Sequence, residues 1–133
     1  MKYRILDGVP LVVVLLFCQT TLAGQDGLAA QSPEWRCETE RKWECQLPFG
    51  CEELDPTRVW VDINFSEGTY QRCDDGGCDA YRITVTERGL FTYIRLDEHP
   101  DTFMKIGLAS YFVEVATRGI SPINSFGVCR PSN

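Results

Sequence analysis

Residues 81–96 read Tyr-Arg-Ile-Thr-Val-Thr-Glu-Arg-Gly-Leu-Phe-Thr-Tyr-Ile-Arg-Leu, and this stretch decides the fold. In its first half the apolar residues Tyr81, Ile83 and Val85 alternate with polar ones, which is the two-residue period of a half-buried strand. Gly89 then follows Glu-Arg and is the residue expected to take positive φ in a short hairpin turn. The next seven residues return as a second strand rich in β-formers. We therefore predict a β-hairpin.

The same alternation recurs on both sides of this hairpin. It predicts strands at residues 58–65 and 69–73 upstream, and at 102–108, 111–117 and 123–129 downstream. Turn-forming residues separate these segments at short, regular intervals, which is typical of a sandwich or barrel and not of alternating βα units. Several later strands are apolar on both faces, so a sheet with one solvated face is disfavoured. We predict an all-β fold, a small antiparallel meander of about seven or eight strands that forms a barrel or a two-layer sandwich.

The N-terminus has the order of regions found in a secretory signal peptide. Lys2 and Arg4 precede an apolar run at residues 11–17, and small residues follow up to Ala23. This order predicts that residues 1–23 are a cleaved signal peptide, and the run is shorter than the roughly 20 residues of a membrane span. A lipoprotein signal at Cys18 is disfavoured because a large residue precedes it. The mature protein is therefore expected to be secreted or periplasmic.

The expected mature chain is one small acidic domain. Residues 24–33 have no period and are interpreted as a flexible leader, and residues 34–133 as a single β domain. Within it we expect a cysteine-rich arm at 34–56, with two short strands or irregular structure, and the β meander at 57–129. Removal of the signal leaves 11 basic and 18 acidic residues, a net charge near −7. This charge disfavours nucleic acids and anionic membranes as partners and is compatible with a basic protein or a cation.

Cysteine usage is the strongest global signal. Six cysteines remain after export, and an even number in a short exported chain predicts a disulfide framework. They are Cys37, Cys45, Cys51, Cys73, Cys78 and Cys129. Metal binding is disfavoured because no C-x-x-C pair occurs, and we predict no cofactor. Cys73 and Cys78 bracket a short loop and are expected to pair, whereas Cys129 is expected to pair with one of the three cysteines of the arm.

Two acidic loops are the candidate binding sites. The first contains Asp74, Asp75 and Asp79 around two glycines, and the second runs through Asp97, Glu98, His99 and Asp101. Calcium is an alternative for the first loop, but the spacing does not match the twelve-residue calcium loop. A solvated turn, in which Asp bonds its own backbone, is the favoured interpretation. A redox-active cysteine pair there is disfavoured because no cation or helix start is nearby to lower a thiol pKa.

Catalysis is the alternative interpretation of the second loop. His99 is the sole histidine, and a hydrolase would use it as the base or would use paired carboxylates. No serine lies in a nucleophile-elbow pattern. Whether the chain is an enzyme stays open, and an exposed loop histidine is the favoured interpretation.

Aromatic residues are a further candidate binding surface. A ligand surface is one interpretation of these side chains, and packing of tryptophans against disulfides is the favoured one. They are Trp35, Trp43, Trp60, Tyr70, Tyr93 and Tyr111.

The predicted function is that of an exported, non-enzymatic binding or interaction module whose partner is a basic protein or a small ligand. In size, export signal and a cysteine near the C-terminus the chain resembles the compact exported barrels that bacteria use as periplasmic enzyme inhibitors. This resemblance of architecture implies an inhibitor-like module. The alternatives are a small hydrolase and a structural envelope protein without a discrete ligand.

Overall fold

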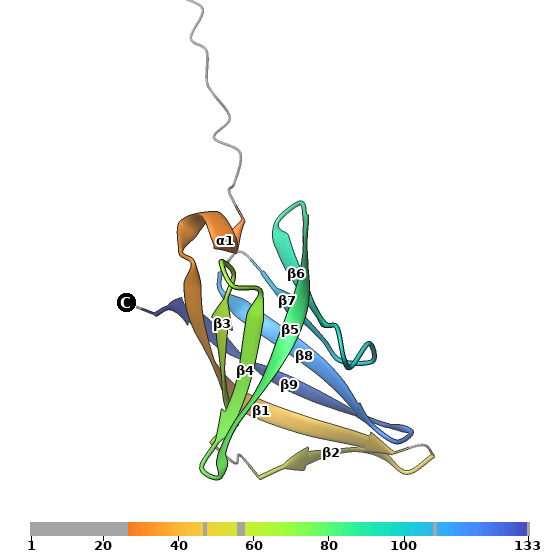
Figure 1. Cartoon of the computed structure of the whole chain (residues 1–133). Helices are drawn as coiled ribbons and strands as arrows, with labels where there is room; N and C mark the ends of the chain where they lie inside the picture. The colour runs from red at the N-terminus through yellow and green to blue at the C-terminus, as the bar shows by residue number, and fades with distance from the viewer. Residues whose placement is uncertain (1–26, 47, 56–57, 108, 133) are drawn as a thin grey trace, which may run out of the picture.

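The computed structural model describes residues 27–46, 48–55, 58–107 and 109–132, so the expected signal peptide lies outside the described residues. Within them the protein is almost entirely antiparallel β structure (Figure 1). The elements are α1 (Leu28–Gln31), β1 (Glu34–Gln46), β2 (Gly50–Leu54), β3 (Trp60–Asn64), β4 (Thr69–Asp74), β5 (Gly77–Arg88), β6 (Phe91–Leu96), β7 (Phe103–Ile106), β8 (Tyr111–Arg118) and β9 (Ser121–Pro131). No helix in these residues is long and apolar enough to cross a membrane.

Eight of the strands form a closed barrel. The order is β1-β3-β4-β5-β6-β7-β8-β9, each strand is antiparallel to its neighbour, and β9 pairs back with β1. The predicted meander is confirmed, and of the two predicted architectures the structure is the barrel. An eight-stranded barrel has an interior just wide enough to be filled by side chains or to take one small ligand. β2 lies outside this ring and pairs with the end of β1.

The central hairpin is confirmed. β5 and β6 pair from Ile83 opposite Leu96 to Arg88 opposite Phe91, and Gly89 in the turn has φ of 59°. β5 is longer than predicted because it begins at Gly77. Its first half pairs with β4 and its second half with β6, so this one strand joins the two sides of the barrel.

β1 corrects the expectation of a cysteine-rich arm at residues 34–56. It is a continuous strand of 13 residues that pairs with β3 along its first half, with β9 along most of its length and with β2 at its end. Trp35 and Cys37 face the interior and are buried. A register shift between Thr39 and Arg41 then changes the alternation. The charged side chains in the middle of this segment lie on a strand that closes the barrel.

All three predicted disulfides are present, and each joins residues directly opposite each other in neighbouring strands. Cys73 pairs with Cys78 as predicted, and Cys129 pairs with Cys37, one of the three candidates left open. The third bond joins Cys45 and Cys51 across β1 and β2. Because a one-residue slip would move every side chain to the other face, these bonds also fix the strand register.

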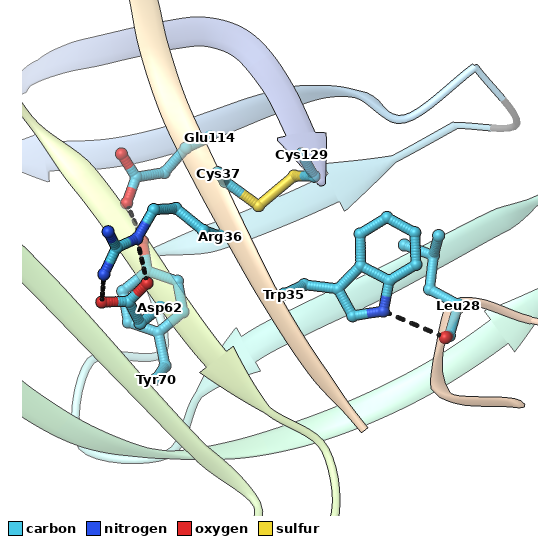
Figure 2. The surroundings of a disulfide bond; sticks show 8 residues. All are labelled: Leu28, Trp35, Arg36, Cys37, Asp62, Tyr70, Glu114 and Cys129. Atoms are coloured by element: carbon cyan, nitrogen blue, oxygen red, sulfur yellow. Dashed lines mark hydrogen bonds and ion pairs between the residues drawn. A yellow bond between two sulfur atoms is a disulfide. The ribbon is translucent and has the colours of Figure 1, made fainter. Parts of the chain in front are cut away.

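The N-terminal side of the barrel is covered by α1. Leu28 is buried there, and the Trp35 indole Nε1 donates a hydrogen bond to its carbonyl oxygen at 3.2 Å (Figure 2). The same Nε1 donates to the Ser32 carbonyl oxygen at 3.1 Å. In Figure 2 the Cys37–Cys129 disulfide lies beside this indole. The packed α1 differs from the flexible leader expected at residues 24–33, of which 24–26 lie outside the described residues.

The outer surface of β1 and β3 is joined by charged and aromatic contacts. Arg36 donates to both carboxylate oxygens of Asp62 at 2.7 and 2.8 Å. This hydrogen bonding raises the pKa of Arg36. The guanidinium groups of Arg36 and Arg58 lie 5.9 and 5.7 Å from the ring centre of Trp60, so a side chain of β1 partly covers this tryptophan. The side chain that covers Trp60 from β1 therefore belongs to a strand of the barrel itself.

The barrel interior contains one contiguous apolar core. Its largest members come from β3, β4, β6, β7 and β8, and they are Val61, Ile63, Tyr70, Ile94, Met104, Ile106 and Phe112. Gly127 on β9 lies where a close approach requires glycine. A Cβ atom there would lie 1.9 Å from the Glu38 carbonyl oxygen and 2.8 Å from the Phe112 ring, so any side chain would displace the backbone of β1.

The three disulfides should differ in their contribution to stability. Cys37–Cys129 spans 92 residues of sequence and Cys73–Cys78 spans 5. By loop-closure entropy, their removal should cost about 4–5 and about 2 kcal/mol, respectively. The paired variants Cys37→Ala/Cys129→Ala and Cys73→Ala/Cys78→Ala, compared by urea unfolding, test this order. Equal losses, or a greater loss for the short bridge, would contradict it.

Candidate functional site at the hairpin end of the barrel

The two ends of the barrel differ in what covers them. α1 covers one end, and four turns surround the other, namely β1–β2, β4–β5, β6–β7 and β8–β9 (Figure 1). We call this second end the hairpin end. Because consecutive strands run in opposite directions, the two predicted acidic loops, 74–79 and 97–101, both lie at the hairpin end.

A buried charged cluster lies inside the barrel. Glu114 on β8 is 2% exposed, and the Tyr70 hydroxyl donates a hydrogen bond to its carboxylate (Figure 2). Arg72 places its Nη1 atom 2.6 Å from both carboxylate oxygens. Alternation along β4 directs Tyr70 and Arg72 to the same inner face, toward β8. A buried carboxylate is costly unless it is paired and hydrogen-bonded, and here both conditions are met.

The cluster controls the protonation of its own members. Burial, followed by the charge of Glu114, raises the pKa of Tyr70 well above its usual value, so the phenol stays neutral and acts as a donor. For Arg72, burial favours the neutral form, but the adjacent Glu114 carboxylate outweighs it and the pKa is raised. Arg72 is therefore charged although its side chain is only 27% exposed.

Lys42 adds a second cation to the inner face. It follows the register shift in β1 and lies opposite Ser125, which is buried. Burial lowers its pKa first, and the charge of Arg72 lowers it further, while Glu114 acts in the opposite direction. In the protein without a ligand, burial and the nearby charge of Arg72 therefore disfavour the charged form of Lys42.

A hollow of about 380 Å³ lies at the hairpin end, beside the cluster. Its lining includes Arg72, Asp74, Asp79 and the glycines of the β4–β5 turn. Arg72 and Asp79 are directly opposite in the β4–β5 register, so their side chains share the inner face. The hollow thus has the partly buried guanidinium of Arg72 at its inner end and the carboxylates of Asp74 and Asp79 at its rim. Its volume is within the range of small-ligand sites.

An aromatic row connects the second acidic loop to the cluster. Tyr81 follows Asp79 by two residues and has the same orientation. Its ring centre lies 6.3 Å from that of Tyr70 and 5.3 Å from that of His99. His99 therefore reaches the hairpin end, but among the described residues no serine hydroxyl or carboxylate is hydrogen-bonded to its ring.

Three of the predicted acidic residues accept hydrogen bonds, Asp74 within its own turn and Asp97 and Glu98 from residues of β5. An oxygen of Asp74 accepts from the Gly76 amide at 2.7 Å, as expected for a solvated turn. Asp97 accepts from the Thr84 hydroxyl at 2.7 Å. Glu98 accepts from the backbone amide of Arg82 at 3.3 Å.

The other predicted acids, Asp75, Asp79 and Asp101, are exposed. Within the described part of the chain no group of three or more His, Cys, Asp or Glu side chains is arranged to bind a metal ion.

Sequence reasoning missed Lys42, Tyr70, Arg72 and Glu114 as parts of one site. A signal was present for Glu114, since it lies at an inner position of β8 two residues after the buried Phe112. A charged residue within the apolar alternation of a strand indicates a buried pair, but its partner on β4 is 42 residues away in sequence. The pair can be identified only from the closed barrel, in which β4 and β8 face each other.

Comparison with family models, curated proteins and solved structures found no match to this chain. The arrangement of the residues is therefore the basis for inferring function. Chemically, the hairpin end presents a fixed guanidinium, rim carboxylates and aromatic rings, which are groups that bind and orient a charged molecule.

Replacing Tyr70 by Phe tests the cluster. The variant removes the hydroxyl that donates to Glu114, so unfolding should require about 1.5–3 kcal/mol less free energy at pH 7. Because the folded-state pKa of Tyr70 is raised above the value of about 10 in the unfolded chain, the stability that this group contributes is complete below pH of about 10 and decreases as pH rises toward the folded-state pKa. The difference in unfolding free energy between wild type and Tyr70→Phe should therefore become smaller above pH of about 10. Urea unfolding at pH 7 and at alkaline pH measures this difference. A difference that increases with pH would contradict the role of the Tyr70 hydroxyl as a donor to Glu114.

Proposed function

We propose that this protein is an exported, non-enzymatic binding module whose hairpin end takes a small ligand that carries both a carboxylate and an ammonium group, such as an amino acid or a short peptide. The observation that carries the proposal is the placement of Arg72 in the same hollow as Asp74 and Asp79, with its guanidinium fixed from behind by the buried Glu114. A fixed cation with carboxylates at the rim is complementary to a molecule of two opposite charges.

The anionic group of the ligand is assigned to Arg72. A guanidinium has five N–H donors, and the contacts with Glu114 involve only its Nη1 atom. The Tyr70 hydroxyl also interacts with the guanidinium, and the Nε and Nη2 donors that Glu114 does not use are assigned to a carboxylate in a bidentate contact. Lys42 supports this assignment, because an anion beside Arg72 would offset the repulsion that contributes to its lowered pKa.

The cationic group of the ligand is assigned to the carboxylates of Asp74 and Asp79 at the rim of the hollow. Asp79 is exposed and has no hydrogen-bonding or ion-pair partner among the described residues. The Gly76 amide donates to Oδ1 of Asp74 and not to its second oxygen, Oδ2. The Tyr81 ring, on the same inner face, offers an apolar surface for the body of the ligand. This site is preformed, because the Cys73–Cys78 bond links the two strands that bear Arg72 and Asp79. A preformed site spends less binding free energy on ordering.

Export is part of the proposal. It is supported by the predicted signal peptide and by the three disulfides, since such bonds persist in oxidising compartments. A small domain with this framework suits a periplasmic or extracellular location, where free amino acids and peptides are accessible.

Calorimetric titration with leucine, N-acetyl-leucine and leucinamide tests the proposed function. Leucine carries both charges, and each analogue lacks one of them. Leucine should bind at least about tenfold more tightly than either analogue, which corresponds to about 1.4 kcal/mol. In Asp79→Asn, affinity for leucine should fall and the preference for leucine over N-acetyl-leucine should shrink.

The matched control is Asp75→Asn, which removes an equal charge from the same turn but from outside the hollow lining. It should bind leucine as the wild type does. Absence of binding for all three compounds, or the same affinities in the two variants, would overturn the proposed site.

A further inference from the structure

Two apolar side chains are almost completely exposed at the hairpin end. Phe49, in the β1–β2 turn, is 86% exposed, and Ile120, in the β8–β9 turn, is 91% exposed. β1 and β9 pair as far as Glu44 opposite Ile123, so the two hairpins lie side by side and their turns project together (Figure 1). We call Phe49 and Ile120 the tip pair. A single exposed apolar residue is ordinary, but two on adjacent projecting turns form a site that nothing in the described chain covers.

The strands that carry the tip pair are joined below both turns. The Cys45–Cys51 bond joins the two strands of the β1–β2 hairpin directly below its turn. On the other hairpin, β8 and β9 pair up to Arg118 opposite Ser121, and Gly119 takes φ of 67° in the turn. An anchor residue next to cross-linked, paired strands loses less conformational freedom when a partner covers it, which favours its use as a binding element.

The charges below the tip pair indicate the kind of partner. Glu44 and Glu52 are directly opposite each other on β1 and β2, close to the disulfide. Like charges in this arrangement destabilise a sheet. Neither carboxylate is in a salt bridge among the described residues, although the charge of Lys42 interacts with that of Glu44, whereas their neighbour Glu53 pairs with Arg41 at 2.8 Å. Basic side chains on a partner would relieve this repulsion.

We propose that the tip pair inserts into an apolar cleft of a partner protein whose rim carries lysine or arginine side chains, which pair with Glu44 and Glu52. This surface is distinct from the hollow at Arg72, and the inference does not depend on the proposed ligand. A second copy of the chain is disfavoured as occupant because a two-fold contact would bring the same carboxylates together. An anionic membrane is disfavoured for the same electrostatic reason.

Site-specific photo-crosslinking in cells that produce the full chain tests the occupant. A photoreactive phenylalanine analogue is placed at Phe49, and the matched control carries it at Leu90, an apolar residue that is 47% exposed in the β5–β6 turn at the other end of the barrel. The expected result is a covalent adduct at position 49, absent at position 90, with one protein whose crosslinked segment is apolar and adjoins basic residues. An adduct with a second copy, an adduct with lipid, or no adduct at position 49 would overturn the proposal.

A binding measurement with the partner so identified separates insertion from proximity. The double variant Phe49→Ser/Ile120→Ser should bind at least about tenfold more weakly than wild type, as expected for anchor residues. Leu90→Ser is the control and should bind normally. Glu52→Gln should slow association at low salt and have little effect at high salt. Equal affinities of wild type and the double variant would overturn the proposal, and because the substituted side chains are exposed, circular dichroism can verify that the variants are folded.

Discussion

The pairing of β1 with β9 is the interaction on which the rest of the structure depends, because it converts a meander into a barrel. It joins the two ends of the described chain along most of β1, and the buried Cys37–Cys129 bond holds it in register. Once the ring is closed, β4 and β8 face each other across the interior, and the inner side chains must fill a fixed space. α1 covers one end through the Trp35 indole, and the other end is left to the hairpins.

Closure also explains the charged cluster. Glu114 is almost completely buried, and its charge is tolerated because Tyr70 and Arg72 reach it from the opposite side of the barrel. A hydrophobic residue at this position would fill the space at lower cost, since buried ion pairs contribute little net stability. The presence of such a group beside a hollow at the open end is the physical basis for proposing that a ligand binds there. The tip pair extends the same end outward, so small-molecule and protein contacts would occur on neighbouring surfaces.

The strands were largely predictable, because period-two alternation and turn residues are local signals. The hairpin at Gly89, the meander order and the Cys73–Cys78 bond all follow from neighbours in sequence. β1 was not predictable as one strand, because most of its positions are exposed or only partly buried and many carry charged residues. Its pairing with three other strands holds it in place without a regular alternation of apolar residues. For the site, Asp74, Asp79 and His99 were found from loop composition, and the structure places them at one end. Arg72 and Glu114 were missed, since their contact joins strands that are remote in sequence.

The sequence by itself determined the class of fold, the positions of most turns and the presence of a disulfide framework, because each depends on residue spacing within a short segment. The tertiary structure decided that the sheet closes on itself, that Cys129 bonds Cys37, and that a guanidinium meets a buried carboxylate beside a hollow. These features depend on contacts between segments separated by 42 to 92 residues. No local pattern encodes them, since only closure of the ring brings the participating side chains to the same face.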